Sequence, residues 1–280
     1  MTGIGIVLII VAGVVLVAGG LYLLAIMPRM LHKPDMKPFY QWLYAHRGLH
    51  DNGTDAPENS MKAFGKAVEA GYGIELDIQL SKDKVPVVFH DFTLKRACDA
   101  EGRVSDYTFE ELQQFRLFKS EEKIPRFEDF LKMVDGRVPL IVEFKIEGRD
   151  LGLCPVADEL LKQYKGMYCM ESFNPLGVKW YRDNRPEVVR GQLSQDFLSE
   201  KDYSGMLYFA LKHLLLNFLS KPDFIAYNHK HHKILSRRLC RGLFGNTAVA
   251  WTVKNQQEFA QAKKHFDMFI FDSFIPAEKK

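Results

Sequence analysis

Two carboxylates two positions apart are the residues of this chain that could most directly do chemistry. Glu75 and Asp77 lie inside the apolar, β-branched run 73–78, where the alternation of a strand would place both side chains on one face. Two adjacent unpaired carboxylates repel each other, so one would keep its proton unless a cation lay between them. A hard divalent cation prefers oxygen ligands of this kind. The sequence therefore predicts a metal site at this strand.

Other polar residues suited to metal and acid–base chemistry interrupt apolar runs along the first half of the chain. These motifs are His46-Arg47-Gly48, Pro57-Glu58-Asn59-Ser60, His90-Asp91 and Glu143-Phe144-Lys145. Imidazole has an unperturbed pKa of about 6.5, so a histidine can take up and release a proton near neutral pH. Together with the paired carboxylates, these residue types favour metal-assisted acid–base catalysis.

From Trp42 onward, short β-branched or aromatic runs alternate with longer helical patterns, which is typical of βα units around a parallel sheet. The candidate strands are Trp42–Ala45, Ile74–Ile78, Pro139–Phe144, Met167–Glu171, Val188–Gly191, Asp223–Tyr227, Ala248–Trp251 and Met268–Phe271. Candidate helices, with apolar residues at helical spacing, are Ser60–Ala70, Leu151–Tyr164, Asn174–Asn184 and Gln256–His265. Eight strands with intervening helices predict an α/β fold, the (β/α)₈ TIM barrel, whose active site lies at the carboxyl ends of the strands.

The candidate site residues fall where this fold requires them. They are His46 at the end of the first strand, Glu75 and Asp77 in the second, Glu143 and Lys145 at the end of the third, Glu171 at the end of the fourth and Trp251 at the end of the seventh. We therefore expect these side chains to converge on one rim of the barrel.

The segment 80–124 is too long for a simple connection between a strand and a helix. It begins with a turn at Ser81–Lys84, returns in a strand-like run at Val85–His90 and contains a helix start at Thr108. We predict a hairpin extension of the second strand, followed by a small insertion at about 92–124 that lies over the barrel mouth.

The amino end has a different composition. Gly3–Met27 contains no charged residue, and at ~1.5 Å per residue it is long enough to cross a hydrocarbon core of roughly 30 Å. A cleaved signal peptide is the alternative, but no Lys or Arg precedes the run and no clear cleavage site follows it. We predict a transmembrane anchor at 1–28, a basic juxtamembrane linker at 29–40 and the TIM-barrel domain at 41–280.

The charges beside this span bear on topology. Arg29, His32, Lys33 and Lys37 follow it against one acid, Asp35, so the positive-inside rule predicts a single-pass membrane protein with a cytoplasmic catalytic domain. The formal net charge of +3 is too small to indicate nucleic-acid binding. Four dispersed cysteines without a CxxC pair disfavour metal–thiolate and redox sites.

Several motifs in a fixed order resemble the glycerophosphodiester phosphodiesterase family. The matching runs are Ala45-His46-Arg47-Gly48, Pro57-Glu58-Asn59-Ser60, Glu75-Leu76-Asp77-Ile78-Gln79-Leu80-Ser81-Lys82-Asp83, Pro86-Val87-Val88-Phe89-His90-Asp91, Glu143-Phe144-Lys145, Glu171-Ser172-Phe173 and Trp251-Thr252-Val253, and the resemblance reaches Asp272. It covers essentially everything after the apolar segment. It departs at Phe269–Ser273, where the family more often has a glycine-rich final strand. The resemblance implies a TIM barrel with an insertion after its second strand.

The resemblance also implies roles for individual residues. Glu75, Asp77 and Glu143 would hold one divalent cation, Ca²⁺ or Mg²⁺, with Glu58 as a further candidate ligand. His46 and His90 would be the acid–base pair, in an order that the sequence leaves open. Arg47 and Lys145 would bind phosphate oxygens, Glu171 would support Lys145 or line the pocket, and Trp251 would form an apolar wall.

The implied activity is hydrolysis of a glycerophosphodiester to an alcohol and sn-glycerol 3-phosphate. A lysophospholipase D acting on membrane lysophospholipids is one alternative, and a catalytically inactive, membrane-tethered phospholipid-binding barrel is another. The apolar stretch Met206–Leu219 is too short to span a bilayer. It is either a barrel helix packed on its neighbours or a helix that lies partly in the membrane interface.

Overall fold

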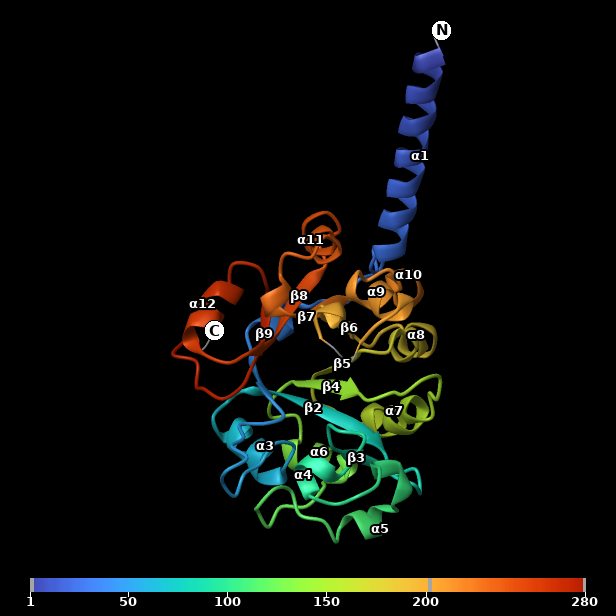
Figure 1. Ribbon diagram of the computed structural model, residues 1–280. Coiled ribbons are helices and arrows are strands. Elements are labelled where there is room, and N and C mark those ends of the chain that lie inside the picture. The colour runs from blue at the N-terminus through green and yellow to red at the C-terminus, as the bar shows by residue number, and fades with distance from the viewer. Residues whose placement is uncertain (1–2, 201–202, 279–280) are drawn as a thin grey trace.

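The computed structural model describes residues 3–200 and 203–278 as a barrel with one long helix projecting from its side (Figure 1). Eight parallel strands form the barrel: β1 (Leu43–His46), β2 (Gly73–Leu80), β4 (Leu140–Phe144), β5 (Tyr168–Ser172), β6 (Arg190–Ser194), β7 (Phe224–Asn228), β8 (Thr247–Val253) and β9 (Met268–Phe271). Each strand pairs with its neighbours along the chain, and β1 pairs with both β9 and β2, which closes the sheet. The predicted TIM barrel and its eight strands are confirmed.

Helices surround the strands. They are α3 (Met61–Glu69), α6 (Phe127–Val134), α7 (Leu153–Gln163), α8 (Pro175–Asn184), α9 (Met206–Lys212), α10 (Asn217–Ser220), α11 (Leu235–Gly242) and α12 (Gln256–Ala262). Polar residues cap the amino-terminal ends of α3, α8 and α12. The side chains of Ser60, Asn174 and Asn255 each accept a hydrogen bond from a backbone N–H in the first turn of the helix.

The alternation of side chains along β2 explains how the barrel positions its polar residues. Ile74, Leu76 and Ile78 belong to the core between the strands and the surrounding helices. Glu75 and Asp77 alternate with them and therefore point to the interior of the barrel. The predicted common face of the two carboxylates is confirmed, and it is the inner face.

The interior is packed at the end where the strands begin. Inward-facing residues of several strands, among them Tyr44 and Phe224, form a cluster with Met36 and Phe39. Phe39 lies in the short helix α2 (Lys37–Tyr40) and is 4% exposed. The segment expected to be a linker is thus packed against the amino-terminal end of the barrel, which leaves the carboxyl ends of the strands for a site.

The segment after β2 forms the predicted hairpin and insertion. β3 (Pro86–Val88) pairs antiparallel with the end of β2. It is followed by α4 (Lys95–Cys98), a 3₁₀ turn at Val104–Asp106 and α5 (Phe109–Leu112). These elements share a small apolar cluster of their own, built around side chains such as Phe89, Leu94 and Leu117.

The amino-terminal helix α1 (Gly3–Ile26) is long and apolar, and Ile4–Ile26 meets the length and composition of a membrane span. The side chains along this apolar helix are not buried in the described structure. The exception is the end that meets the barrel, where Ile26 is buried. The apolar stretch Met206–Leu219 forms the two short helices α9 and α10, with Leu214 in a left-handed conformation (φ 57°) between them.

Candidate active site

Three carboxylates meet inside the carboxyl-terminal rim of the barrel. Glu75 and Asp77 come from β2 and Glu143 from the neighbouring β4, where Asp77 and Glu143 are register partners. One oxygen of each lies within 4.8 Å of the others, and all three residues are buried. The three residues expected as ligands of one cation are therefore brought together.

The pKa values of the three carboxylates are shifted in different directions. Burial and the neighbouring carboxylates of Asp77 and Glu143 raise the pKa of Glu75 well above its usual range. Burial also raises the pKa of Glu143, despite Lys145 beside it. Burial alone would raise the pKa of Asp77 too, but the charges of His90, Arg47 and Lys145 outweigh it and hold that pKa well below the usual range.

A fourth carboxylate, Glu171 on β5, is the register partner of Glu143 and is 1% exposed. Burial and the charges of Glu143 and Asp77 raise its pKa well above the usual range. Glu171 Oε2 and Asp77 Oδ1 are both buried without a hydrogen-bond donor among the described residues. Buried carboxylate oxygens without donors are costly, so the site fits a divalent cation that prefers oxygen ligands.

His46 lies at the end of β1 between two carboxylates. Its Nδ1 is 3.1 Å from Asp272 Oδ2, and its Nε2 is 4.0 Å from Glu75 Oε2. Burial and the charge of Arg47 lower the pKa of His46 to about 4, although the Asp272 carboxylate opposes this shift. The imidazole is accordingly neutral near neutral pH.

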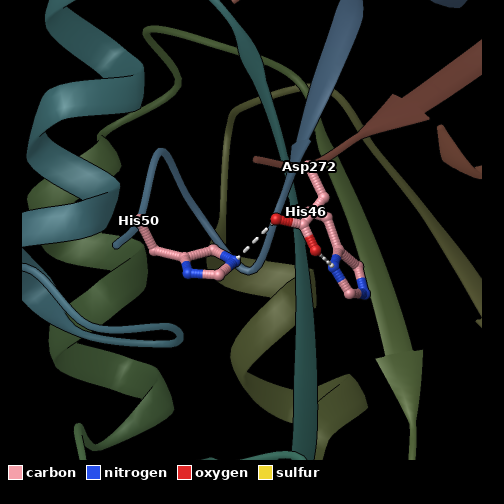
Figure 2. Close-up of side chains that lie close together, drawn as sticks. All are labelled: His46, His50 and Asp272. Atoms are coloured by element: carbon pink, nitrogen blue, oxygen red, sulfur yellow. Dashed lines mark hydrogen bonds and ion pairs between the residues drawn. The ribbon is translucent and has the colours of Figure 1, made fainter. Parts of the chain in front are cut away.

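A second histidine, His50, shares Asp272 with His46, and Figure 2 shows the carboxylate between the two rings. His50 Nε2 is 3.3 Å from Asp272 Oδ1. Burial would raise the pKa of Asp272, but its hydrogen bond with His46 and its contact with His50 hold that pKa well below the usual range. No role was expected for His50 or Asp272 from the sequence. Closure of the predicted barrel, which pairs the last strand with the first, is the feature that could have indicated their contact.

Arg47 is held over the carboxylates by the turn that follows β1. Its backbone N–H donates to Glu75 Oε2 (3.1 Å), and its guanidinium lies 3.2 Å from Asp77 Oδ2 and 2.8 Å from Glu58 Oε1. Arg47 has a positive φ of 55°, and the next residue, Gly48, has φ 83°. A Cβ at Gly48 would lie 2.9 Å from the backbone of Ala63 in α3, so this turn requires glycine.

Glu58, the further candidate ligand, lies outside the group of three carboxylates. Arg96 donates to both of its oxygens at 2.6 Å and 3.0 Å, and Asn52 donates to Oε2 at 2.8 Å. Burial would raise the pKa of Glu58, but Arg96 and Arg47 outweigh burial and hold it at about 2. In this structure, Glu58 orients Arg47.

His90 and Lys145 complete the histidines and cations around the carboxylates. His90 Nδ1 is 2.5 Å from Asp91 Oδ1, and Arg96 also donates to Asp91. Lys145 Nζ is 2.8 Å from Glu143 Oε1 and 3.7 Å from Asp77 Oδ1. Lys145 is thus in direct contact with the carboxylate group, and the charge of His90 acts on Asp77 and Glu143 in the direction that lowers their pKa.

An aromatic wall borders the cationic side. The ring of Phe173 lies 5.9 Å from Lys145 Nζ and packs edge-on against Trp251 at a centroid distance of 5.4 Å. Trp251 lies in β8 and is half-buried.

Comparisons with known proteins agree with this site. Residues 46–273 match the model of the glycerophosphoryl diester phosphodiesterase family. Glycerophosphodiester phosphodiesterase 1 of Bos taurus is 42% identical over 268 residues, which cover 82% of this chain and 77% of that protein. A glycerophosphodiester phosphodiesterase of Bacillus altitudinis is 31% identical over 57% of this chain and 69% of its own.

Solved structures show the same fold at lower identity. A phosphodiesterase of Oleispira antarctica, in complex with the product sn-glycerol-3-phosphate, has a TM-score of 0.67 at 22% identity and covers 82% of this chain and 92% of that chain. A glycerophosphodiester phosphodiesterase of Thermotoga maritima has a TM-score of 0.63 at 22% identity, over 82% of this chain and 94% of its own. The chain belongs to the glycerophosphodiester phosphodiesterase family and is a phosphoric diester hydrolase.

Proposed function

We propose that this enzyme hydrolyses glycerophosphodiesters to an alcohol and sn-glycerol 3-phosphate, with one divalent cation and with His46 and His90 as the acid–base pair. The observation that carries the proposal is the convergence of Glu75, Asp77 and Glu143 beside His46. A Ca²⁺ or Mg²⁺ ion bound by these carboxylates would polarise the phosphoryl oxygens and neutralise their charge.

The hydrogen bonds of the two histidines suit proton transfer. An ionised carboxylate can only accept, so His46 donates from Nδ1 to Asp272, and this leaves the lone pair of Nε2 on the side of Glu75. His90 makes the same type of bond to Asp91. Each ring therefore presents Nε2 to take a proton from the attacking oxygen or to give one to the departing alkoxide.

Arg47 and Lys145 would bind the phosphate oxygens. Arg47 lies 3.2 Å from Asp77 Oδ2, and Lys145 lies 2.8 Å from Glu143 Oε1 and 3.7 Å from Asp77 Oδ1, so both cations border the carboxylate group. A phosphodiester between them would receive the planar fork of the guanidinium and the point charge of the ammonium. Glu171 lies beside Glu143 and would hold Lys145 or a ligand in place.

We further propose that α1 is an uncleaved single-pass anchor, with the barrel in the cytoplasm. The supporting observation is the end of the helix: Ile26 is fully buried in the barrel core, and its carbonyl accepts a hydrogen bond from Asn217 at 2.9 Å. A signal peptide is removed from the folded domain, whereas this helix end is part of its packing.

A lysophospholipid is the second candidate substrate. The aromatic wall at Phe173 and Trp251 borders the cationic side of the site and could contact an acyl chain that a soluble diester lacks. The inactive-barrel alternative requires a broken site, but the sequence contains all of His46, His90, Glu75, Asp77 and Glu143.

The test is an assay of the purified protein on a panel of glycerophosphodiesters and lysophospholipids, with both products identified. Release of sn-glycerol 3-phosphate is expected, and substituting His46 or His90 by Ala should lower turnover by roughly 10²–10⁴-fold. Circular dichroism must show that the variants are folded. Turnover near the wild-type rate in a folded variant of either residue would remove that residue from the mechanism.

A further inference from the structure

The end of α1 is fixed to one side of the barrel. The Ile26 carbonyl accepts from Asn217 in α10 and from the Cys240 thiol in α11, at 2.9 Å and 3.3 Å. Lys221 Nζ donates to the Met27 carbonyl at 3.2 Å, and the Arg29 backbone N–H donates to the Pro222 carbonyl at 3.1 Å. Because these bonds come from two helices and a loop, the helix holds a defined position over α10 and α11.

Exposed apolar side chains gather around this point. They are Met30, Leu31, Met206, Leu207, Phe209, Phe218, Leu235 and Leu243. We call this set, on or next to α9, α10 and α11 and on the segment after α1, the docking face. Met206 is 79% exposed and Leu207 is 59% exposed. Among the described residues outside α1, the exposed large apolar side chains that do not belong to the docking face are Leu198 and Ile275.

The same region is almost free of acids. Between Tyr203 and Gln257 the chain carries one acidic residue, Asp223, which is buried and lies 3.4 Å from Arg29. In contrast, Lys230, Lys233 and Arg238 are exposed on or next to α11, and none of them has an acidic partner among the described residues. The docking face is therefore apolar with an unpaired basic border, the composition of a surface that binds at an anionic bilayer.

We propose that the docking face lies on the surface of the bilayer that α1 crosses, with its apolar side chains at the boundary between headgroups and acyl chains. The proposal rests on α1 being an uncleaved anchor. Figure 1 shows α1 projecting from the side of the barrel formed by α9, α10 and α11, so a bilayer around α1 meets these helices first. A second copy of the chain is a poorer occupant, because a two-fold contact would bring the same unpaired basic residues together.

The docking face is connected to the catalytic site by a row of aromatic rings. Tyr208 in α9 packs on Phe197 at a centroid distance of 5.6 Å, and Phe197 packs on Phe173 at 5.9 Å. Phe173 in turn lies beside Lys145 and Trp251. On the bilayer, this row would form an apolar path from the acyl region to the phosphate-binding side of the site.

The test uses the full chain in lipid nanodiscs that contain phosphatidylglycerol. An environment-sensitive fluorophore is attached to Leu207→Cys and, separately, to Phe218→Cys, in a Cys98→Ser background because the other three cysteines are buried. The matched control is Glu110→Cys, an exposed position on α5 on the far side of the barrel from α1 (Figure 1). The parallel readout is hydrolysis of a soluble glycerophosphodiester, which reports on the site and not on docking.

We expect the emission at 207 and 218 to shift to shorter wavelength and to be quenched by lipids that carry a nitroxide on the acyl chain, with neither effect at 110. If the fluorophores at 207 and 218 emit at the same long wavelength as the one at 110 and are not quenched, the proposal is overturned. A blue-shifted but unquenched emission would also overturn it, since a protein partner would then cover the face. If either labelled variant fails to fold, Met206→Cys and Leu243→Cys make the same test at exposed positions.

Discussion

At the scale of single residues, the site depends on how its acids are partnered. Asp272 accepts a hydrogen bond from His46 and lies 3.3 Å from His50, so a single carboxylate fixes the ring orientation and the tautomer of the histidine beside Glu75. Glu58 acts similarly on Arg47. Neither acid belongs to the group of three carboxylates, and both position residues of the proposed mechanism.

The position of Asp272 gives the first prediction. Substituting Asp272 by Asn should lower kcat by roughly 10–100-fold, because an amide no longer enforces the tautomer that leaves Nε2 of His46 as the acceptor. Steady-state kinetics on a soluble diester measure the effect, and thermal unfolding controls for structure. His50→Gln is the matched control, since His50 shares the same acid without adjoining Glu75. An equal loss in both variants, or none in Asp272→Asn, would contradict the assigned role.

Most of the site residues could be predicted from the sequence, because strand alternation and strand order are local properties. Glu75 and Asp77 follow from the period of a strand, and Glu143 follows from its place at the end of the next parallel strand. His50 and Asp272 could not be assigned in this way, since their contact crosses more than two hundred residues of sequence. It is created only when β9 pairs with β1.

At the scale of elements, the region from Met206 to Leu219 shows how a uniformly apolar sequence divides between core and surface. Leu214 is 2% exposed and packs in the barrel core, whereas Met206 and Phe218 are 79% and 47% exposed. The sequence could not separate these positions, because the chain turns at Leu214 and starts a new helix instead of continuing one periodic face.

This division gives the second prediction. Leu214→Ala should lower the free energy of unfolding by about 2–5 kcal/mol, as is usual for a leucine removed from a packed core. Met206→Ala should change it by less than about 0.5 kcal/mol, because that side chain is exposed in the absence of lipid. Denaturant unfolding measures both. Equal effects of the two substitutions would show that the region is packed differently.

At the scale of the whole molecule, α1 and the barrel form one unit. The segment 29–40, expected as a linker, is bonded to the barrel at several points: Lys33 Nζ donates to the Phe244 carbonyl at 3.0 Å, and the Tyr40 hydroxyl lies 2.6 Å from that of Thr247. Part of the positive charge beside the span is also neutralised, since Arg29 is paired with Asp223.

The third prediction concerns this amino end. The protein recovered from the membrane fraction should have the intact mass of the full chain, because the end of α1 is packed into the folded domain. A reporter fused after Lys280 should behave as cytoplasmic, fluorescent as a green fluorescent protein fusion and inactive as an alkaline phosphatase fusion. A mass that lacks α1 would contradict the anchor, and an active phosphatase fusion would place the barrel outside.

The central claim is that Glu75, Asp77 and Glu143 bind a divalent cation that hydrolysis requires. The most direct measurement is turnover of a soluble glycerophosphodiester by the chelated enzyme, with metal content determined by elemental analysis. We predict loss of activity on chelation, recovery with Ca²⁺ or Mg²⁺, and loss of bound metal in Asp77→Asn. Full activity in excess chelator, with no metal bound, would contradict the account.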